Sequence, residues 1–167
     1  MSTAHVVTLA VVNVLAWPVI HVGFAWAGTR VRPDRFDPDA WLYRTRAFER
    51  TGGIYEVLFG VKAWKGRLPD GAAWFKSGFK KGSLARADRA YLDRFVVETC
   101  RGELVHWATF LAAGIFFLWN EAWVGWIMVA YGVVANLPCI IVQRYNRVRI
   151  RQLIDQREAR DGGRDRA

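Results

Sequence analysis

The sequence has few of the residues on which metal sites, disulfide frameworks and covalent catalysis depend. Its 167 residues include two cysteines, Cys100 and Cys139, and three histidines. Two cysteines so far apart support neither a disulfide framework nor a zinc site. The sequence also lacks a glycine-rich phosphate loop and a nucleophile elbow. We therefore expect no bound metal and no permanently bound cofactor, which leaves general-base transfer between two bound substrates as the simplest enzymatic scheme.

Basic residues are missing from two long stretches, although the chain carries a formal charge of +9. Lys and Arg are absent before Arg30 and from 103–142, whereas 16 lie in 30–101 and eight in 144–166. The positive-inside rule therefore predicts a cytoplasmic segment at 28–103, a cytoplasmic C-terminus and an outer N-terminus. Because no recognition motif accompanies the charge, we expect it to attract anionic membrane lipids and not nucleic acid.

Apolar residues make up 53% of the chain and are concentrated in three blocks, 5–26, 104–119 and 122–142. A membrane-spanning helix needs about 20 apolar residues, so the first and third blocks are long enough and the second is short. We predict an all-α protein of the cell membrane with about three transmembrane helices. Residues 1–156 form a single integral membrane domain in this interpretation, and the polar residues 157–167 form a disordered tail.

The segment between the first two apolar blocks is too apolar for a bare linker. Residues 41–50 fit a short helix that carries aromatic and basic side chains. Residues 54–64 are apolar but too few to span a bilayer, which predicts an amphipathic helix at the interface or a re-entrant one. From about Ala85 the spacing of apolar residues becomes helical, and we expect this helix to continue into the second span.

The third apolar block ends in a polar stripe. Asn136 lies inside the apolar run, and Gln143 and Arg147 fall on the same helix face at about 100° per residue. Pro138 removes a backbone N–H and is expected to kink the helix beside Asn136. Polar groups at membrane depth should face protein or a cavity. An asparagine that hydrogen-bonds between helices, followed by basic residues that reach the membrane surface, explains the stripe about as well as a binding site does. The candidate binding residues of this stripe are Asn136, Gln143, Arg144, Asn146, Arg147 and Arg149.

The strongest catalytic candidates are Glu103 and His106, which share a helix face because they are three residues apart. A carboxylate that accepts a hydrogen bond from one imidazole nitrogen fixes the tautomer and leaves the other nitrogen as a base. The alternative is an interfacial histidine beside a glutamate that neutralises an arginine. Glu98 and Arg101, which can pair along the same helix, are further candidate binding residues.

Two segments carry a family resemblance. The first is Glu98-Thr99-Cys100-Arg101-Gly102-Glu103-Leu104-Val105-His106-Trp107, and the second includes Ala135-Asn136-Leu137-Pro138 and Gln143-Arg144-Tyr145-Asn146-Arg147-Val148-Arg149. With shorter matches at Gly28-Thr29-Arg30, Trp64-Lys65 and Asp70-Gly71, the chain resembles the glycosyl-diaponeurosporenoate acyltransferase family, small membrane enzymes of glycosylated carotenoid synthesis.

The resemblance implies transfer of a fatty acyl group to a hydroxyl of a glycosylated carotenoid or a related lipid or glycolipid. Our hypothesis takes acyl-CoA as the donor, with a thioester that the acceptor hydroxyl attacks. The roles that follow are a base at His106 oriented by Glu103, substrate or oxyanion contacts at Asn136, Gln143 and Asn146, and phosphate contacts at Arg144, Arg147 and Arg149.

Two other functions fit the same polar stripe. One is an S-adenosylmethionine-dependent membrane methyltransferase resembling the isoprenylcysteine type, which also joins few spans to a basic C-terminal helix. The other is a non-catalytic lipid-binding subunit, in which the stripe would pack against another protein and leave no cavity.

Overall fold

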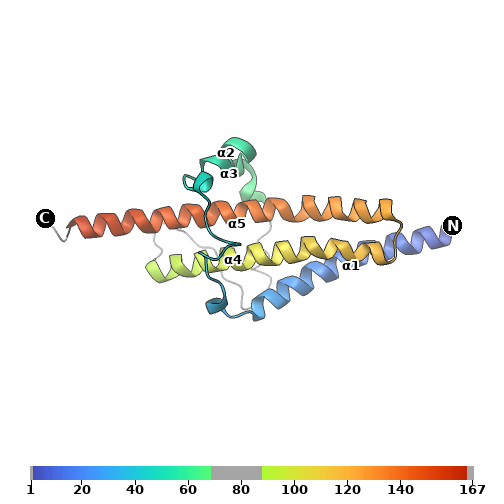
Figure 1. Cartoon of the computed structure of the whole chain (residues 1–167). Coiled ribbons are helices and arrows are strands. Elements are labelled where there is room, and N and C mark those ends of the chain that lie inside the picture. The colour runs from blue at the N-terminus through green and yellow to red at the C-terminus, as the bar shows by residue number, and fades with distance from the viewer. Residues whose placement is uncertain (1, 69–87, 165–167) are drawn as a thin grey trace.

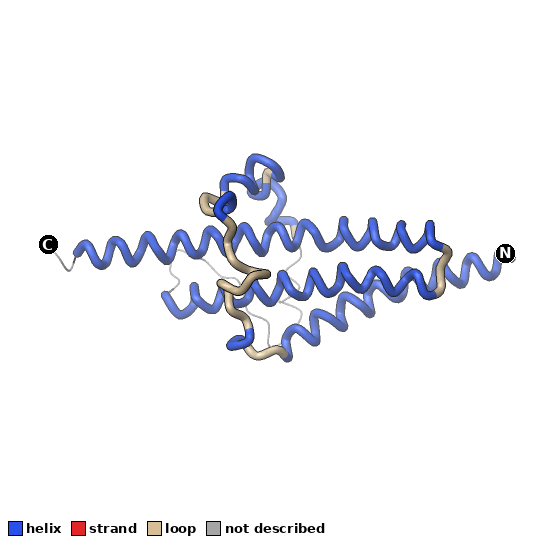
Figure 2. Tube along the Cα trace, in the orientation of Figure 1, coloured by secondary structure: helices blue, strands red, loops and turns tan. Residues whose placement is uncertain are grey.

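Three long helices run side by side and form the body of the protein (Figure 1). The computed structural model describes residues 2–68 and 88–164, in which every regular element is a helix (Figure 2). The long helices are α1 (Thr3–Arg30), α4 (Arg89–Leu111) and α5 (Ala122–Arg164). α4 runs in the opposite direction to α1 and α5. The predicted all-α class is therefore confirmed.

Two helices, α1 and α5, are long and apolar enough to cross a membrane. They contain the first and third predicted spans. The second predicted span, 104–119, forms the end of α4 and the 3₁₀ helix η6 (Ala112–Leu118). This stretch does not itself reach the length and hydropathy of a spanning helix, because the α-helix ends at Leu111 and its first half is charged. η6 joins α4 to α5 through a short turn at Asn120.

α1 contacts α4, η6 and the turn that precedes α5. Gly28 lies so close to α4 that a Cβ there would be 2.5 Å from a side-chain carbon of that helix. Farther along, Trp17 stacks on Phe116 with a centroid distance of 4.9 Å. Near the opposite end, the amides of Asn13 and Asn120 exchange two hydrogen bonds of 2.9 Å. These contacts hold α1 in one register against the α4–η6–α5 hairpin.

The last turns of α5 differ from the prediction of a disordered tail at 157–167. α5 remains helical through Arg164, and residues 165–167 lie outside the described part of the chain. The physical reason is a partner surface on α4. There, Leu92 packs in one apolar cluster with Ile154, and Arg89 donates to Glu158.

Residues 31–68, which follow α1, form turns and short helices that pack on α4 and α5. Where 41–50 favoured a helix, the structure has turns and a single 3₁₀ turn. The apolar stretch 54–64 is helical but divided at Gly60, whose φ of 55° is the left-handed region that favours glycine. Tyr55 and Val61 from the two halves pack against α5. The short elements are η1 (Pro33–Arg35), η2 (Ala47–Glu49), α2 (Gly53–Phe59), α3 (Val61–Trp64) and η3 (Lys65–Arg67); the motif Asp70-Gly71 lies outside the described residues.

The close approach of α1 to α4 makes a testable prediction. Gly28→Ala places a methyl group against Cγ2 of Val105, a β-branched side chain with little rotamer freedom, so α1 must move away. Overpacking of this kind costs about 1–3 kcal/mol. We expect a lower melting temperature in detergent for Gly28→Ala. The control is Gly23→Ala in the same helix, which meets nothing within 4 Å and should not lower it. Equal melting temperatures for the two variants would contradict this packing.

Candidate functional site

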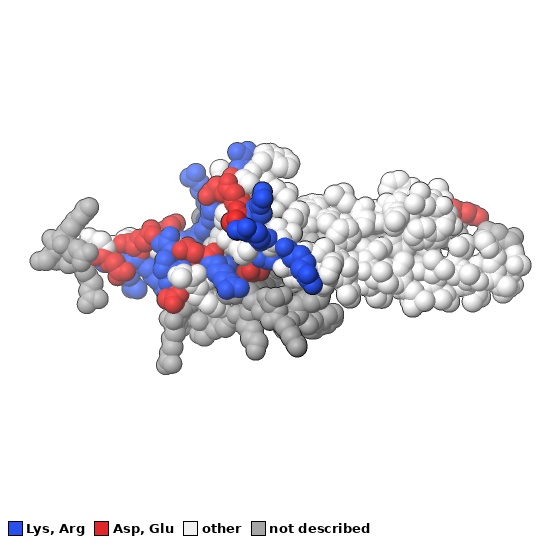
Figure 3. All heavy atoms as spheres, turned by 90° about the horizontal axis from the view of Figure 1, so that it is seen from below, with Lys and Arg blue, Asp and Glu red and all other residues white. Residues whose placement is uncertain are grey.

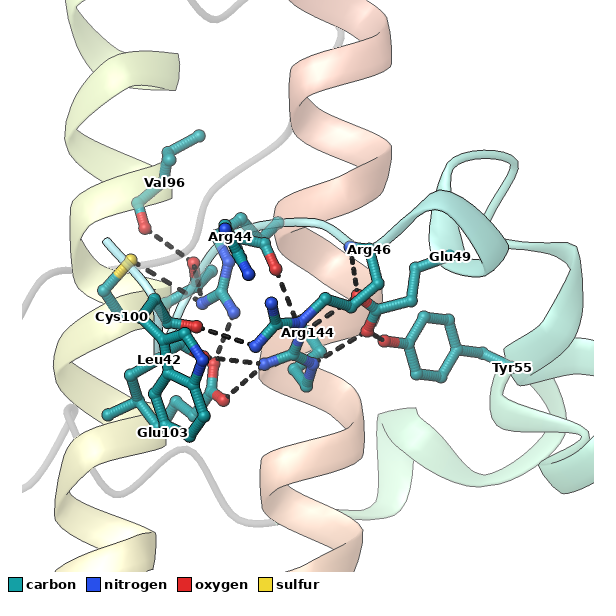
Figure 4. A network of polar contacts seen from close by, with 12 residues as sticks. Leu42, Arg44, Arg46, Glu49, Tyr55, Val96, Cys100, Glu103 and Arg144 are labelled. Carbon is teal, nitrogen blue, oxygen red and sulfur yellow. Dashed lines mark hydrogen bonds and ion pairs between the residues drawn. The ribbon is translucent and has the colours of Figure 1, made fainter. Parts of the chain in front are cut away.

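Four ionised side chains form a chain of ion pairs between α4, α5 and the turn before α2 (Figure 4). Arg144 of α5 holds Glu49 through two parallel bonds of 2.8 and 2.9 Å, and contacts Glu103 of α4 at 2.8 Å. Arg147 donates to the other carboxylate oxygen of Glu103. Glu49, Glu103 and Arg147 are buried. Two carboxylates and two guanidinium groups thus neutralise one another at the junction of three chain segments.

Arg144 has no N–H left for a substrate phosphate. Its guanidinium carries five donors, and besides the two carboxylates it donates to the carbonyls of Leu42 at 3.0 Å and Arg44 at 3.3 Å. Together these contacts use all five. The predicted phosphate-binding role therefore does not fit Arg144 in this structure.

Arg147 is likewise enclosed by protein. Besides Glu103, its guanidinium contacts Oγ1 of Thr99 at 3.4 Å and Sγ of Cys100 at 3.6 Å, and lies over the ring of Tyr43. With 1% of its surface exposed, it cannot reach a phosphate without opening this part of the bundle. Both arginines bind carboxylates of this chain, whereas the sequence predicted that they contact the phosphates of the acyl donor.

Glu49 is held as a carboxylate. Burial alone would raise its pKa, but hydrogen bonds from Arg144, from the hydroxyl of Tyr55 and from the backbone N–H of Arg46, with the charge of Arg144, lower the pKa to about 2. Burial and the bond to Glu49 raise the pKa of Tyr55. The turn that carries Glu49 is therefore attached to α5 by a charge that persists at neutral pH.

His106 and Asn136 form a second polar contact between α4 and α5. Nδ1 of His106 lies 3.0 Å from Oδ1 of Asn136. The side-chain nitrogen of the same asparagine, Nδ2, donates to the carbonyl of Gly132 at 2.9 Å. Because the amide nitrogen is committed to Gly132, the amide oxygen accepts from Nδ1–H of His106. The neutral ring then carries its lone pair on Nε2. Asn136 is completely buried, whereas His106 is half-buried.

This geometry corrects the expected relation between the two catalytic candidates. Glu103 was expected to orient His106, since the two share a face of α4. Instead both oxygens of Glu103 accept bonds from arginines of α5, and the partner of Nδ1 is the amide of Asn136. The positive charges on α5 attract the carboxylate more strongly than a neutral imidazole does.

Gln143 lies against α4 because the facing residue is a glycine. A Cβ on Gly102 would be 2.9 Å from Cδ and Nε2 of Gln143. Oε1 of Gln143 is buried and accepts no hydrogen bond from the residues that the structure describes. Gln143 is seven residues after Asn136 and Gly102 is four before His106, so the two contacts share one helix–helix seam. A neutral polar column thus runs beside the ion pairs.

The other predicted residues lie away from this seam. Arg101 donates to the carbonyls of Gly28 and Val31 at 2.8 and 3.0 Å, and it pairs with Glu98 at 3.1 Å. These contacts hold the end of α1. Arg149 is exposed and donates to Gln152, and Asn146 is half-buried. The structure therefore brings together five of the ten predicted residues, Glu103, His106, Asn136, Arg144 and Arg147, with Gln143 close beside them.

Sequence reasoning missed Glu49, Tyr55 and Tyr43. The available signal for Glu49 was its position as the one acidic residue between Arg44 and Arg50. Its partner, Arg144, follows 95 residues later, so no helical spacing could link them. The two tyrosines gave no signal beyond their apolar character.

Two hollows of the described chain lie at opposite ends of the bundle. One, of about 430 Å³, lies between α1 and the start of α5 and is lined by apolar residues such as Leu9 and Ile127. The other, of about 370 Å³, lies between Arg89 of α4 and Arg157 of α5. Neither is lined by His106 or Asn136. Within residues 2–68 and 88–164, no three His, Cys, Asp or Glu side chains lie close enough to hold a metal ion.

Removal of the Glu103 charge should destabilise the bundle severely. Glu103→Gln removes the carboxylate that pairs with Arg147 and leaves Arg144 paired with Glu49. Breaking a buried ion pair in this way costs about 3–5 kcal/mol. The free energy of unfolding in detergent measures the loss. Asp93→Asn on the same helix breaks an exposed pair and should change it by less than about 1 kcal/mol. Similar losses in both variants would contradict the role given to Glu103.

The lowered pKa of Glu49 predicts acid sensitivity. Since its folded pKa of about 2 lies below the ordinary value of 4.5, ionised Glu49 stabilises the fold at neutral pH. That contribution is lost as pH falls from about 4.5 to about 2. We expect the melting temperature of the wild type to fall more steeply over this window than that of Glu49→Gln, which has no group to protonate there. Parallel curves would show that Glu49 does not contribute.

Comparison with known proteins places the chain in a family. The family model described as glycosyl-4,4'-diaponeurosporenoate acyltransferase (CrtO) matches residues 39–156, which include the seam between α4 and α5. Proteins of that name from Staphylococcus aureus strains bovine RF122 / ET3-1, N315 and USA300 are each 31% identical over 138 residues, 83% of this chain and 83% of each relative. No solved structure matches the chain. The chain therefore belongs to the glycosyl-4,4'-diaponeurosporenoate acyltransferase family.

Proposed function

We propose that this protein transfers a fatty acyl group to a sugar hydroxyl of a glycosylated carotenoid. The name of its family describes acyl transfer to glycosyl-4,4'-diaponeurosporenoate. The observation that supports a site for this reaction is the contact between His106 and Asn136. It gives the half-buried imidazole one fixed tautomer. Family membership favours acyl transfer over the two alternatives, a methyltransferase and a non-catalytic lipid-binding subunit.

His106 is the proposed general base. Nε2 takes the proton of the acceptor hydroxyl as its oxygen attacks the acyl carbonyl carbon of the donor. The tetrahedral intermediate collapses with loss of the donor's leaving group, a thiolate if the donor is acyl-CoA. That thiolate recovers the proton from His106, so an ester and a free thiol are formed and the enzyme is unchanged. Asn136 acts as a positioning residue, because its amide oxygen holds Nδ1–H in place throughout.

Gln143 is the proposed contact for the sugar. Its buried Oε1 has no hydrogen-bond donor in the described chain, and a buried acceptor without a donor is costly. A sugar hydroxyl would supply that donor, one helix turn from His106 along the same seam. Asn136 is already bonded through both ends of its amide, so we assign it to His106 and not to the oxyanion.

The acyl donor follows from the reaction, and we propose acyl-CoA because the charged end of the protein offers its phosphates a water-facing surface. Arg144 and Arg147 take no part in this proposal, since their donors are committed to carboxylates. Glu103 remains the counter-ion of both arginines. It acts on catalysis only by keeping α4 and α5 in register.

We also propose three membrane crossings, with the charged end of the bundle in the cytoplasm. α1 and α5 supply two, and the end of α4 with η6 supplies the third. Figure 3 supports a single boundary, because charged side chains gather over one half of the face shown and the other half is almost entirely uncharged. The excess of Lys and Arg at the charged half then sets the orientation.

Substitution of His106 tests the mechanism. His106→Gln should lower kcat by about 10²–10⁴-fold, the usual contribution of a general base. Asn136→Leu should lower kcat and shift its pH dependence, and Asn136→Asp, which keeps an acceptor for Nδ1–H, should retain more activity. The product, an acylated carotenoid glycoside made from acyl-CoA by purified protein, is measured by mass spectrometry.

The matched control is His21→Gln in α1. Within the described structure, the hydrogen-bonding partner of His21 is the carbonyl of Trp17. This variant should keep near-normal turnover. If His106→Gln folds and also keeps near-normal turnover, His106 is not the base.

A further inference from the structure

The hairpin of α2 and α3 exposes three consecutive apolar side chains. Val57, Leu58 and Phe59 are 84%, 63% and 46% exposed. The opposite side of the same hairpin is buried, because Tyr55 and Val61 pack on α5. A run of exposed apolar residues beside a packed face is typical of a surface that contacts membrane or another molecule.

This hairpin packs on α5 where that helix changes from apolar to charged. Its buried face contacts Ile141 and Val142, the last residues of the apolar run, and Tyr145, which follows the first arginine. Figure 1 shows α2 and α3 standing off one side of α5. If the apolar part of α5 lies in the bilayer, the exposed tip of the hairpin lies at the level of the lipid headgroups.

Cations surround the buried side of this hairpin. Nζ of Lys65 lies 4.7 Å from the ring centroid of Tyr145, which holds the half-buried ammonium group against α5. Arg149 packs against Gly52. A Cβ added to this glycine would lie 3.3 Å from Cδ of Arg149. Lys62 completes the set at the start of α3. We name Lys62, Lys65 and Arg149 the hairpin cations.

The hairpin cations exceed the negative charge beside them. Glu56 is the carboxylate that faces Lys65 and Tyr145, and it also accepts the backbone N–H of Lys62 at 3.1 Å. Burial lowers the pKa of Lys65, and the charges of Arg149 and Lys62 lower it further against the opposing effect of Glu56. A bound anion would relieve this repulsion between like charges.

The position of Arg149 favours a lipid phosphate over a donor phosphate. Arg149 follows Asn136 by 13 residues, which places it about 220° around the helix. The hairpin cations therefore lie on the far side of α5 from the seam that holds His106. A headgroup phosphate at the bilayer boundary would therefore approach them on the side of α5 opposite that seam.

We propose that the α2–α3 hairpin binds anionic phospholipid, with Val57, Leu58 and Phe59 inserted among acyl chains and the hairpin cations on the headgroup phosphate. The proposal depends on the membrane placement given above and not on acyl transfer. Each basic side chain near an anionic surface adds to the electrostatic attraction. The hairpin thereby ties the charged segment before α4 to one leaflet.

The first experiment measures the melting temperature of the full-length protein in neutral detergent with added phosphatidylglycerol, phosphatidylcholine or inorganic phosphate. We expect phosphatidylglycerol alone to raise it, and the triple variant Lys62→Gln, Lys65→Gln, Arg149→Gln to lose most of the rise. The control triple variant, Arg32→Gln, Arg35→Gln, Arg160→Gln, removes the same charge from exposed positions elsewhere and should keep it. An equal rise with inorganic phosphate, or equal loss in both triple variants, would overturn the headgroup site.

The second experiment measures the depth of the hairpin tip. An environment-sensitive fluorophore on Leu58→Cys, in vesicles containing phosphatidylglycerol, should be quenched by a lipid-borne quencher. The same fluorophore on Ala159→Cys, at an exposed position near the end of α5, should not be. Labelled wild type corrects for Cys100 and Cys139. A Leu58 fluorophore as accessible to water as the Ala159 fluorophore would overturn the insertion. A tip that binds a partner protein and not lipid would give this same result in the vesicles. Acyl transfer is assayed separately in detergent, so failure here leaves that function untouched.

Discussion

The arrangement of the charged half of this protein depends on the five N–H groups of Arg144. They bind Glu49 and Glu103 and the carbonyls of Leu42 and Arg44, which lie before η2. One side chain of α5 therefore positions α4 and the segment that precedes it. A lysine offers three donors from a single point and could not reproduce this fork. Arg147 supports the same centre from one turn farther along α5, since it neutralises the second oxygen of Glu103.

The ion pairs and the proposed catalytic contact occupy different levels of the same helix–helix seam. Glu103 is three residues before His106 on α4, yet the two side chains contact different partners on α5. The charged level is saturated and buried, which suits it to hold geometry. The level of His106 and Asn136 is neutral and partly exposed, which suits it to exchange a proton with a substrate. In the proposed mechanism, this division would let α4 and α5 stay fixed while the imidazole takes up and releases a proton.

The helices were largely predictable from the sequence, and the partners of polar side chains were not. Apolar blocks and the gaps in Lys and Arg are properties of short stretches, so they located α1, α5 and the turn at Asn120. The 3.6-residue period correctly placed Asn136, Gln143 and Arg147 on one face, and that face meets α4. The same local reasoning paired Glu103 with His106, because it cannot weigh an arginine on another helix. Glu49 escaped notice for the same reason.

The short turn between α4 and α5 has a consequence for the order of assembly. Glu103 precedes Arg144 by 41 residues and Arg147 by 44, and the intervening chain is one tight hairpin. In a newly made α4–α5 hairpin, the carboxylate of Glu103 on α4 thus faces the guanidinium groups of Arg144 and Arg147 on α5. These ion pairs can form without the rest of the chain. Of the four side chains in the ion-pair cluster, Glu49 is the one that comes from outside the hairpin, and it binds the remaining donors of Arg144. α4 and α5 then behave as one folding unit on which the earlier segments are laid.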